Sequence, residues 1–148
     1  MALAPQPEQR RDTIDTAIIT IARFPLQISS LNMQPPSCPF DGTVLIVEDH
    51  PLYSDALAHL ARIIFARGQV VEAASAETGL RIASTLSDLR LVLLDFRLSG
   101  LGGVEAVSAF HQKFPLARVV VISASEDRRE ATAALCAGAK AFVSKAAR

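Results

Sequence analysis

The candidate chemistry of this chain lies at the ends of short apolar runs. Apolar residues 91–94 are followed directly by a carboxylate, Asp95, and apolar residues 44–47 are followed by two more, Glu48 and Asp49. A short continuous apolar run is typical of a strand buried on both faces in a parallel sheet. The carboxyl ends of such strands lie along one edge, which is where ligands bind in open α/β sheets. The three carboxylates are therefore expected to lie close together.

Two later predicted strands end in groups that complement these carboxylates. Residues 118–122 lead to Ser123, and residues 140–144 lead to Lys145. Clustered carboxylates repel one another unless a cation lies among them, and hard oxygen ligands suit Mg²⁺. A lysine can hold a phosphate, a serine hydroxyl can donate to a phosphoryl oxygen, and an aspartate can accept a phosphoryl group. Each residue alone could be a turn or surface residue, but the whole set at four strand ends is hard to obtain by chance.

The elements that must position these residues alternate between strand and helix from Thr43 onwards. Apolar residues follow the first strand at helical spacing, and Pro51 suits the first turn of that helix. Gly68 can end this helix, and Ser75 can cap the next one. Short loops between buried strands require right-handed crossovers and a parallel sheet covered on both faces. The pattern predicts strands at 44–47, 69–73, 91–95, 118–123 and 140–144, with helices between them.

Composition indicates a globular protein without a bulk electrostatic partner. Half of the 148 residues are hydrophobic, which is enough for one domain with a core. Lys+Arg and Asp+Glu are both 15, so zero net charge argues against nucleic acid or an anionic membrane as a partner. The two cysteines lack metal-site spacing and are expected to be reduced thiols. No apolar run approaches the ~20 residues of a membrane span, so a cytoplasmic location is expected.

Residues 1–42 are expected to be an N-terminal extension and linker, with the domain at 43–148. Residues 34–39, Gln-Pro-Pro-Ser-Cys-Pro, exclude a regular helix or a central strand. Residues 12–23 could form a short helix with three isoleucines on one side, although their β-branched content equally suits a strand.

The region from about Thr43 to Lys145 resembles the receiver domain of two-component response regulators. The motifs that carry the resemblance are Val-Glu-Asp-His-Pro (47–51), Leu-Leu-Asp-Phe-Arg-Leu (93–98), Val-Ile-Ser-Ala (121–124) and Gly-Ala-Lys-Ala-Phe-Val-Ser-Lys (138–145). Alanine rather than proline after Lys145 is similar to receivers of the NarL/FixJ (LuxR-type) transcription factors. The resemblance implies an α/β, flavodoxin-like (CheY-like) doubly wound fold with a five-stranded parallel sheet of order 2-1-3-4-5.

The resemblance also implies a phosphorylation site. Asp95 would take a phosphoryl group from a histidine kinase or a phosphotransfer protein. Asp49 and Asp95 would coordinate Mg²⁺ with the backbone carbonyl of Arg97, while Glu48 would act through a bound water. His50 is interpreted as a structural loop residue beside this site. The chain would then be a signalling switch and not an enzyme, with self-catalysed phosphotransfer and autodephosphorylation at most.

The switch itself would involve three further positions. Ser123 and Lys145 would contact the phosphoryl oxygens, and Phe142 would turn inward when Ser123 moves toward the phosphoryl group. Ordinary core packing is an equally serious interpretation of Phe142, because a strand of this kind needs an apolar residue there.

The family has a further helix after the last strand, but only three residues follow Lys145. Without that helix, exposed apolar sheet surface would mark association or instability. Three explanations stay open: a piece of a longer regulator, a homodimer formed through the uncovered face, or residues 12–24 folded back as a substitute helix. Because no DNA-binding helix-turn-helix follows, this chain is not expected to bind nucleic acid in the family's way.

Two other functions are alternatives to a phosphorylation-controlled switch. A pseudo-receiver would keep the fold as a protein-interaction module without phosphotransfer; the intact set of site residues argues against it, and the missing helix argues for it. A phosphohydrolase of the haloacid dehalogenase type needs a second aspartate two residues after the nucleophile. Arg97 occupies that position, which argues against the hydrolase.

Overall fold

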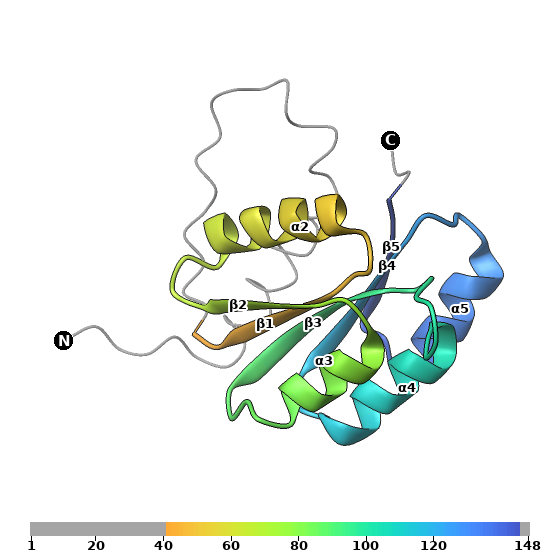
Figure 1. Cartoon of the computed structure of the whole chain (residues 1–148). Coiled ribbons are helices and arrows are strands. Elements are labelled where there is room, and N and C mark those ends of the chain that lie inside the picture. The colour runs from red at the N-terminus through yellow and green to blue at the C-terminus, as the bar shows by residue number, and fades with distance from the viewer. Residues whose placement is uncertain (1–40, 146–148) are drawn as a thin grey trace.

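The computed structural model describes residues 41–145, in which five parallel strands alternate with four helices (Figure 1). The strands are β1 (Thr43–Val47), β2 (Gln69–Ala73), β3 (Leu89–Asp95), β4 (Arg118–Ser123) and β5 (Ala141–Ser144), and the helices are α2 (Pro51–Ile64), α3 (Ala76–Ala83), α4 (Gly103–Lys113) and α5 (Arg128–Cys136). The sheet order β2-β1-β3-β4-β5 confirms the predicted doubly wound topology. The expected helix over 12–24 lies outside the described residues.

The sheet is covered on both faces, as its apolar strands require. Helix α2 lies over one face, and α3, α4 and α5 lie over the other (Figure 1). Along β1, Val44 and Ile46 face α2, while Leu45 and Val47 face the other three helices. All four side chains are fully buried. This is the double burial that a continuous apolar run predicts for a central parallel strand.

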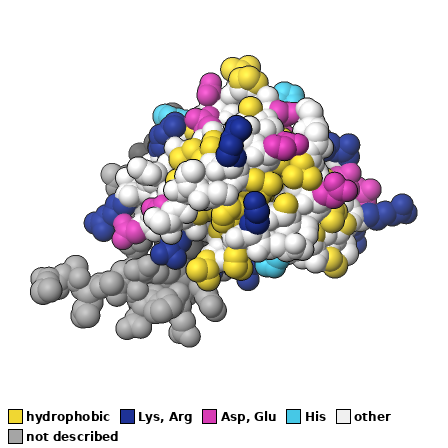
Figure 2. Space-filling view, turned by 60° about the horizontal axis from the view of Figure 1, so that its bottom comes forward, with side chains coloured by type: hydrophobic (Ala, Val, Ile, Leu, Met, Phe, Trp, Pro, Cys, Tyr) yellow, Lys and Arg dark blue, Asp and Glu magenta, His cyan; other side chains and the backbone are white. Residues whose placement is uncertain are grey.

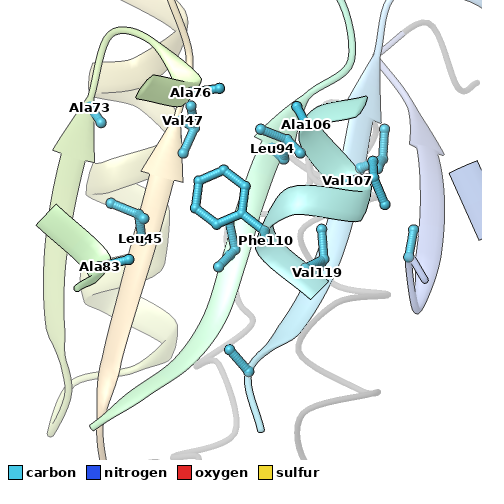
Figure 3. Packing of buried hydrophobic residues seen from close by; sticks show 14 of the residues in the cluster. Leu45, Val47, Ala73, Ala76, Ala83, Leu94, Ala106, Val107, Phe110 and Val119 are labelled. Carbon is cyan, nitrogen blue, oxygen red and sulfur yellow. The ribbon is translucent and has the colours of Figure 1, made fainter. Parts of the chain in front are cut away.

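The core on the three-helix face is centred on Phe110 of α4. Its fully buried ring lies over the sheet near Leu45 and Leu94 (Figure 3). Helix α3 comes close to the same ring through Gly79, where an added Cβ would lie 3.0 Å from Val47 and 3.1 Å from Phe110. The glycine therefore allows α3 to pack closely on the strands whose ends carry the polar residues.

The helices begin shortly after the strands end, and local features of the sequence set the residue at which each helix begins. Pro51 stands in the first turn of α2, as expected. The Ser75 hydroxyl accepts a hydrogen bond from the backbone N–H of Thr78, and the Asp127 carboxylate accepts one from the N–H of Arg129. The Ser75 cap confirms the prediction from sequence, and Asp127 caps α5 in the same way. These caps keep the strand-to-helix loops short along one edge of the sheet.

The structure extends β3 beyond the predicted run. The strand begins at Leu89, before the exposed Arg90 that interrupts the apolar pattern. Thr43 pairs with Leu89 ahead of a register shift, so backbone pairing continues past the point where side-chain periodicity ends.

Within 41–145, no helix is long and apolar enough to cross a bilayer. On the face in Figure 2, acidic and basic side chains are interspersed.

Candidate functional site

The strand register brings the predicted polar residues to one edge of the sheet. Val47 of β1 pairs with Leu94 of β3, so Glu48 and Asp95 come next on adjacent strands. Lys145 follows the end of β5 at the same edge. Glu48, Asp95 and Lys145 therefore lie at the same edge of the sheet, as expected.

Lys145 connects two buried carboxylates. Its Nζ donates a hydrogen bond of 2.7 Å to Glu48 Oε2 and lies 3.5 Å from Asp95 Oδ2. The side chains of Glu48 and Asp95 are only 1% and 4% exposed, and that of Lys145 is 16% exposed. Coulombic attraction between such groups is screened far less than at the surface.

Burial and neighbouring charges act on both members of this pair. Burial raises the pKa of Glu48; the charge of Asp95 adds to this, while the hydrogen bonds from Lys145 and the His50 N–H partly offset it. Burial by itself would lower the pKa of Lys145, but its hydrogen bond to Glu48 and the charges of Asp95 and Glu48 raise it overall. Lys145 therefore carries its positive charge at neutral pH.

Asp49 presents an unsatisfied acceptor beside this pair. Its Oδ1 atom is buried and accepts no hydrogen bond within the described part of the chain. His50 Nδ1 lies 3.1 Å from that oxygen and 3.3 Å from Glu48 Oε1. Ligand atoms of Glu48, Asp49, His50 and Asp95 all lie within 4.8 Å of one another. An orphaned carboxylate oxygen in such a group fits a divalent cation with oxygen ligands.

Arg97, in the loop after β3, makes hydrogen bonds to Asp95 and to Glu130 of α5. Its backbone N–H donates to Asp95 Oδ1 at 3.1 Å, which orients the carboxylate. Its guanidinium donates to Glu130 Oε1 at 2.6 Å, in the first turn of α5. The side chain of Arg97 thus engages α5, while its backbone stays next to the carboxylate cluster.

Ser123 ends β4, and Phe142 lies on the neighbouring strand β5. The buried Ser123 hydroxyl accepts a hydrogen bond from the Ser125 N–H, and the Ser123 carbonyl accepts one from the Lys145 N–H. The half-buried Phe142 ring meets Phe96 edge to face, with ring centroids 5.8 Å apart. Phe96 directly follows Asp95, so this aromatic pair links β5 to the start of the loop after β3.

Two features of the site were not found from sequence. Tyr53 lies with its ring centroid 4.1 Å from Lys145 Nζ, and Glu130 pairs with Arg97 from a distant helix. His50 lies beside the carboxylates as expected, and its role as a loop residue stays a prediction. The position of Tyr53 in the first turn of α2, just after the acidic pair, was a usable signal, whereas no spacing rule relates Arg97 to Glu130.

Comparison with known proteins gives consistent matches. The family model described as response regulator receiver domain matches residues 44–148. The glycerol metabolism activator of Pseudomonas putida is 30% identical over 102 residues, covering 69% of this chain and 46% of that protein. The nitrate/nitrite response regulator NarL of Escherichia coli K12 is 31% identical over 104 residues, covering 70% and 48%. The chain spans about half the length of these relatives.

Solved structures agree with these matches. A LuxR-family two-component response regulator from Aurantimonas sp. SI85-9A1 superposes with a TM-score of 0.65 and 28% identity, covering 73% of this chain and 76% of that one. A CheY-like receiver domain protein from Methanospirillum hungatei JF-1 has a TM-score of 0.65 at 24% identity, covering 74% and 85%, and supports the fold alone.

Proposed function

Since this chain belongs to the response regulator receiver domain family of two-component signal transduction, we propose that Asp95 is its phosphoacceptor. The observation that carries the proposal is the environment of this carboxylate. Asp95 is almost fully buried at a strand end, with the Arg97 N–H on one oxygen and the Lys145 ammonium 3.5 Å from the other. The unsatisfied Asp49 oxygen beside it supports a cation in the same group.

The proposed reaction is a direct phosphoryl transfer. A carboxylate oxygen of Asp95 forms a bond to phosphorus as the P–N bond to a donor phosphohistidine breaks. The electron pair of that bond returns to the imidazole, which takes a proton. The donor would be a histidine kinase or a phosphotransfer protein, and acetyl phosphate can replace it by giving up acetate. Lys145 offsets the charge of the transferring group.

The proposed cation is Mg²⁺, held by Asp49, Asp95 and the backbone carbonyl of Arg97, with Glu48 acting through water. When bound, Mg²⁺ neutralises phosphoryl charge that three clustered carboxylates would otherwise repel. The assignment is supported by carboxylate oxygens of Glu48, Asp49 and Asp95 that lie within 4.8 Å of one another.

The proposed output is a conformational switch in the cytoplasm. A phosphoryl group adds charge next to Ser123, whose hydroxyl has only a neutral backbone donor. Movement of Ser123 toward the new oxygens would break that bond and let Phe142, which now meets Phe96 edge to face, turn inward. A partner, or a second copy of this chain in a homodimer, would read the change.

Intact mass spectrometry after incubation with acetyl phosphate tests the proposal. We expect one added phosphoryl group when Mg²⁺ is present and none when EDTA replaces it. Peptide mapping of the adduct should locate it to the segment containing Asp95. No adduct on a folded chain would instead support the pseudo-receiver, a non-phosphorylated interaction module.

A second prediction concerns Asp49→Asn. Without Mg²⁺, this substitution removes one of three repelling carboxylates, so we expect the free energy of unfolding to rise by about 1 kcal/mol. With Mg²⁺, the wild-type chain should gain stability by mass action, and the variant should gain far less. Urea unfolding with and without Mg²⁺ measures both effects.

The exposed Asp55 of α2 offers the matched control. Asp55→Asn should leave both the basal stability and the Mg²⁺ response unchanged. A normal Mg²⁺ response in the Asp49→Asn variant would exclude Asp49 as a ligand.

A further inference from the structure

We infer that Tyr53 is a positioning residue that holds the ammonium group of Lys145 over the buried carboxylates through a cation–π contact. The inference rests on the proposed function, in which Lys145 contacts the phosphoryl group. It adds a residue that the motifs of the receiver site do not include, four positions after Asp49 on the first turns of α2.

The contacts of Lys145 define where its charge lies. Nζ is 4.1 Å from the centroid of the Tyr53 ring, 2.7 Å from Glu48 Oε2 and 3.5 Å from Asp95 Oδ2. A cation within ~6 Å of a ring face is attracted by the ring quadrupole, and more strongly when it is desolvated. The carboxylates and the ring together hold the ammonium on more than one side.

A lysine at this position needs such support. Its four-carbon stem carries large rotamer freedom, which must be lost before the ammonium can act at a fixed point. Lys145 also follows β5, an edge strand that is only half-buried along its length. A rigid aromatic ring beside the stem reduces the freedom that remains.

Tyr53 is itself held in place. It is partly buried and packs against the core cluster beneath α2, which includes Leu57 and Ile122. Burial raises the pKa of its hydroxyl; the charge of Lys145 lowers it, and the charges of Glu48 and Asp95 raise it, so the phenol is neutral at physiological pH. The attraction therefore comes from the ring face and not from a phenolate, and phenylalanine should preserve it.

Lysine NMR tests the contact without any phosphorylation. The chain has only three lysines, Lys113, Lys140 and Lys145, so a ¹³C-lysine-labelled sample gives a readily assigned spectrum. Ring current should shift the Lys145 Hε signals upfield in the wild type and in Tyr53→Phe, and Tyr53→Leu should remove that shift. An unshifted wild-type signal, or one that Tyr53→Leu leaves in place, would overturn the inference.

The rate of adduct formation with acetyl phosphate and Mg²⁺ tests the consequence. Tyr53→Leu should slow it by about fivefold, while Tyr53→Phe should stay within about twofold of the wild type. In a Lys145→Met background, Tyr53→Leu should have no further effect. Leu52→Ala, at an exposed neighbour in α2, is the control that should leave the rate unchanged.

The outcomes separate the two proposals. If the wild type forms its adduct and a folded Tyr53→Leu variant reacts equally fast, Tyr53 has no positioning role. If the wild type forms no adduct, the phosphoacceptor proposal fails, and the lysine spectrum still decides whether Tyr53 holds Lys145.

Discussion

We expect Asp95→Asn to abolish the Mg²⁺-dependent phosphoryl adduct. The asparagine side chain keeps the size of aspartate and can still accept the hydrogen bond from the Arg97 N–H. It has no carboxylate oxygen with which to form an acyl phosphate, so the loss concerns chemistry and not the fold. Intact mass after incubation with acetyl phosphate and Mg²⁺ is the measurement, and the variant should keep its unmodified mass throughout.

Asp55→Asn on the exposed side of α2 is the matched control, since it removes a carboxylate that is not a member of the cluster and should be phosphorylated like the wild type. An adduct that persists in Asp95→Asn would assign the phosphoryl group elsewhere. Asp49 and Glu48 would then be the next acceptors to test.

The second large effect is expected for Lys145→Met. Methionine keeps an unbranched apolar stem but removes the charge that lies between Glu48 and Asp95. Removing one preorganised group that stabilises charge at a reacting centre typically costs at least a hundredfold in rate. We therefore expect adduct formation from acetyl phosphate to slow by about a hundredfold, measured by intact mass over time.

The same variant should lose stability in a pH-dependent way. Without Lys145, the buried Glu48 carboxylate loses its charged donor, which costs about 2 kcal/mol at neutral pH. Burial already raises the pKa of Glu48, and loss of the lysine raises it further. A carboxyl whose folded pKa lies above its unfolded value favours folding when protonated, so the deficit should shrink as pH falls through the folded pKa. Urea unfolding at neutral and mildly acidic pH measures this.

Lys140→Met provides the control, because Lys140 is exposed and its contact with β4 is made through its backbone N–H. It should change neither the rate nor the pH dependence of stability. Equal rates for Lys145→Met and the wild type would remove Lys145 from the site.

The fold, and the edge of the sheet at which the candidate site lies, could be predicted from the sequence. Strand periodicity and helix caps are local properties, so the runs ending at Asp95 and Ser123 could be identified without a structure. A parallel sheet then brings strand ends to one edge, whatever the details of packing. Four of the six predicted side chains, Glu48, Asp49, Asp95 and Lys145, do lie together, and their roles stay predictions.

The tertiary structure alone decided which partner each side chain takes. Lys145 meets Glu48 across 97 positions of sequence, and Arg97 reaches Glu130 across 33. The ring of Tyr53 beside Lys145 depends on how α2 packs against the sheet relative to the end of β5. Such pairings are set by the register of neighbouring strands and the seating of helices on them, and neither leaves a repeat or spacing in the sequence of this chain.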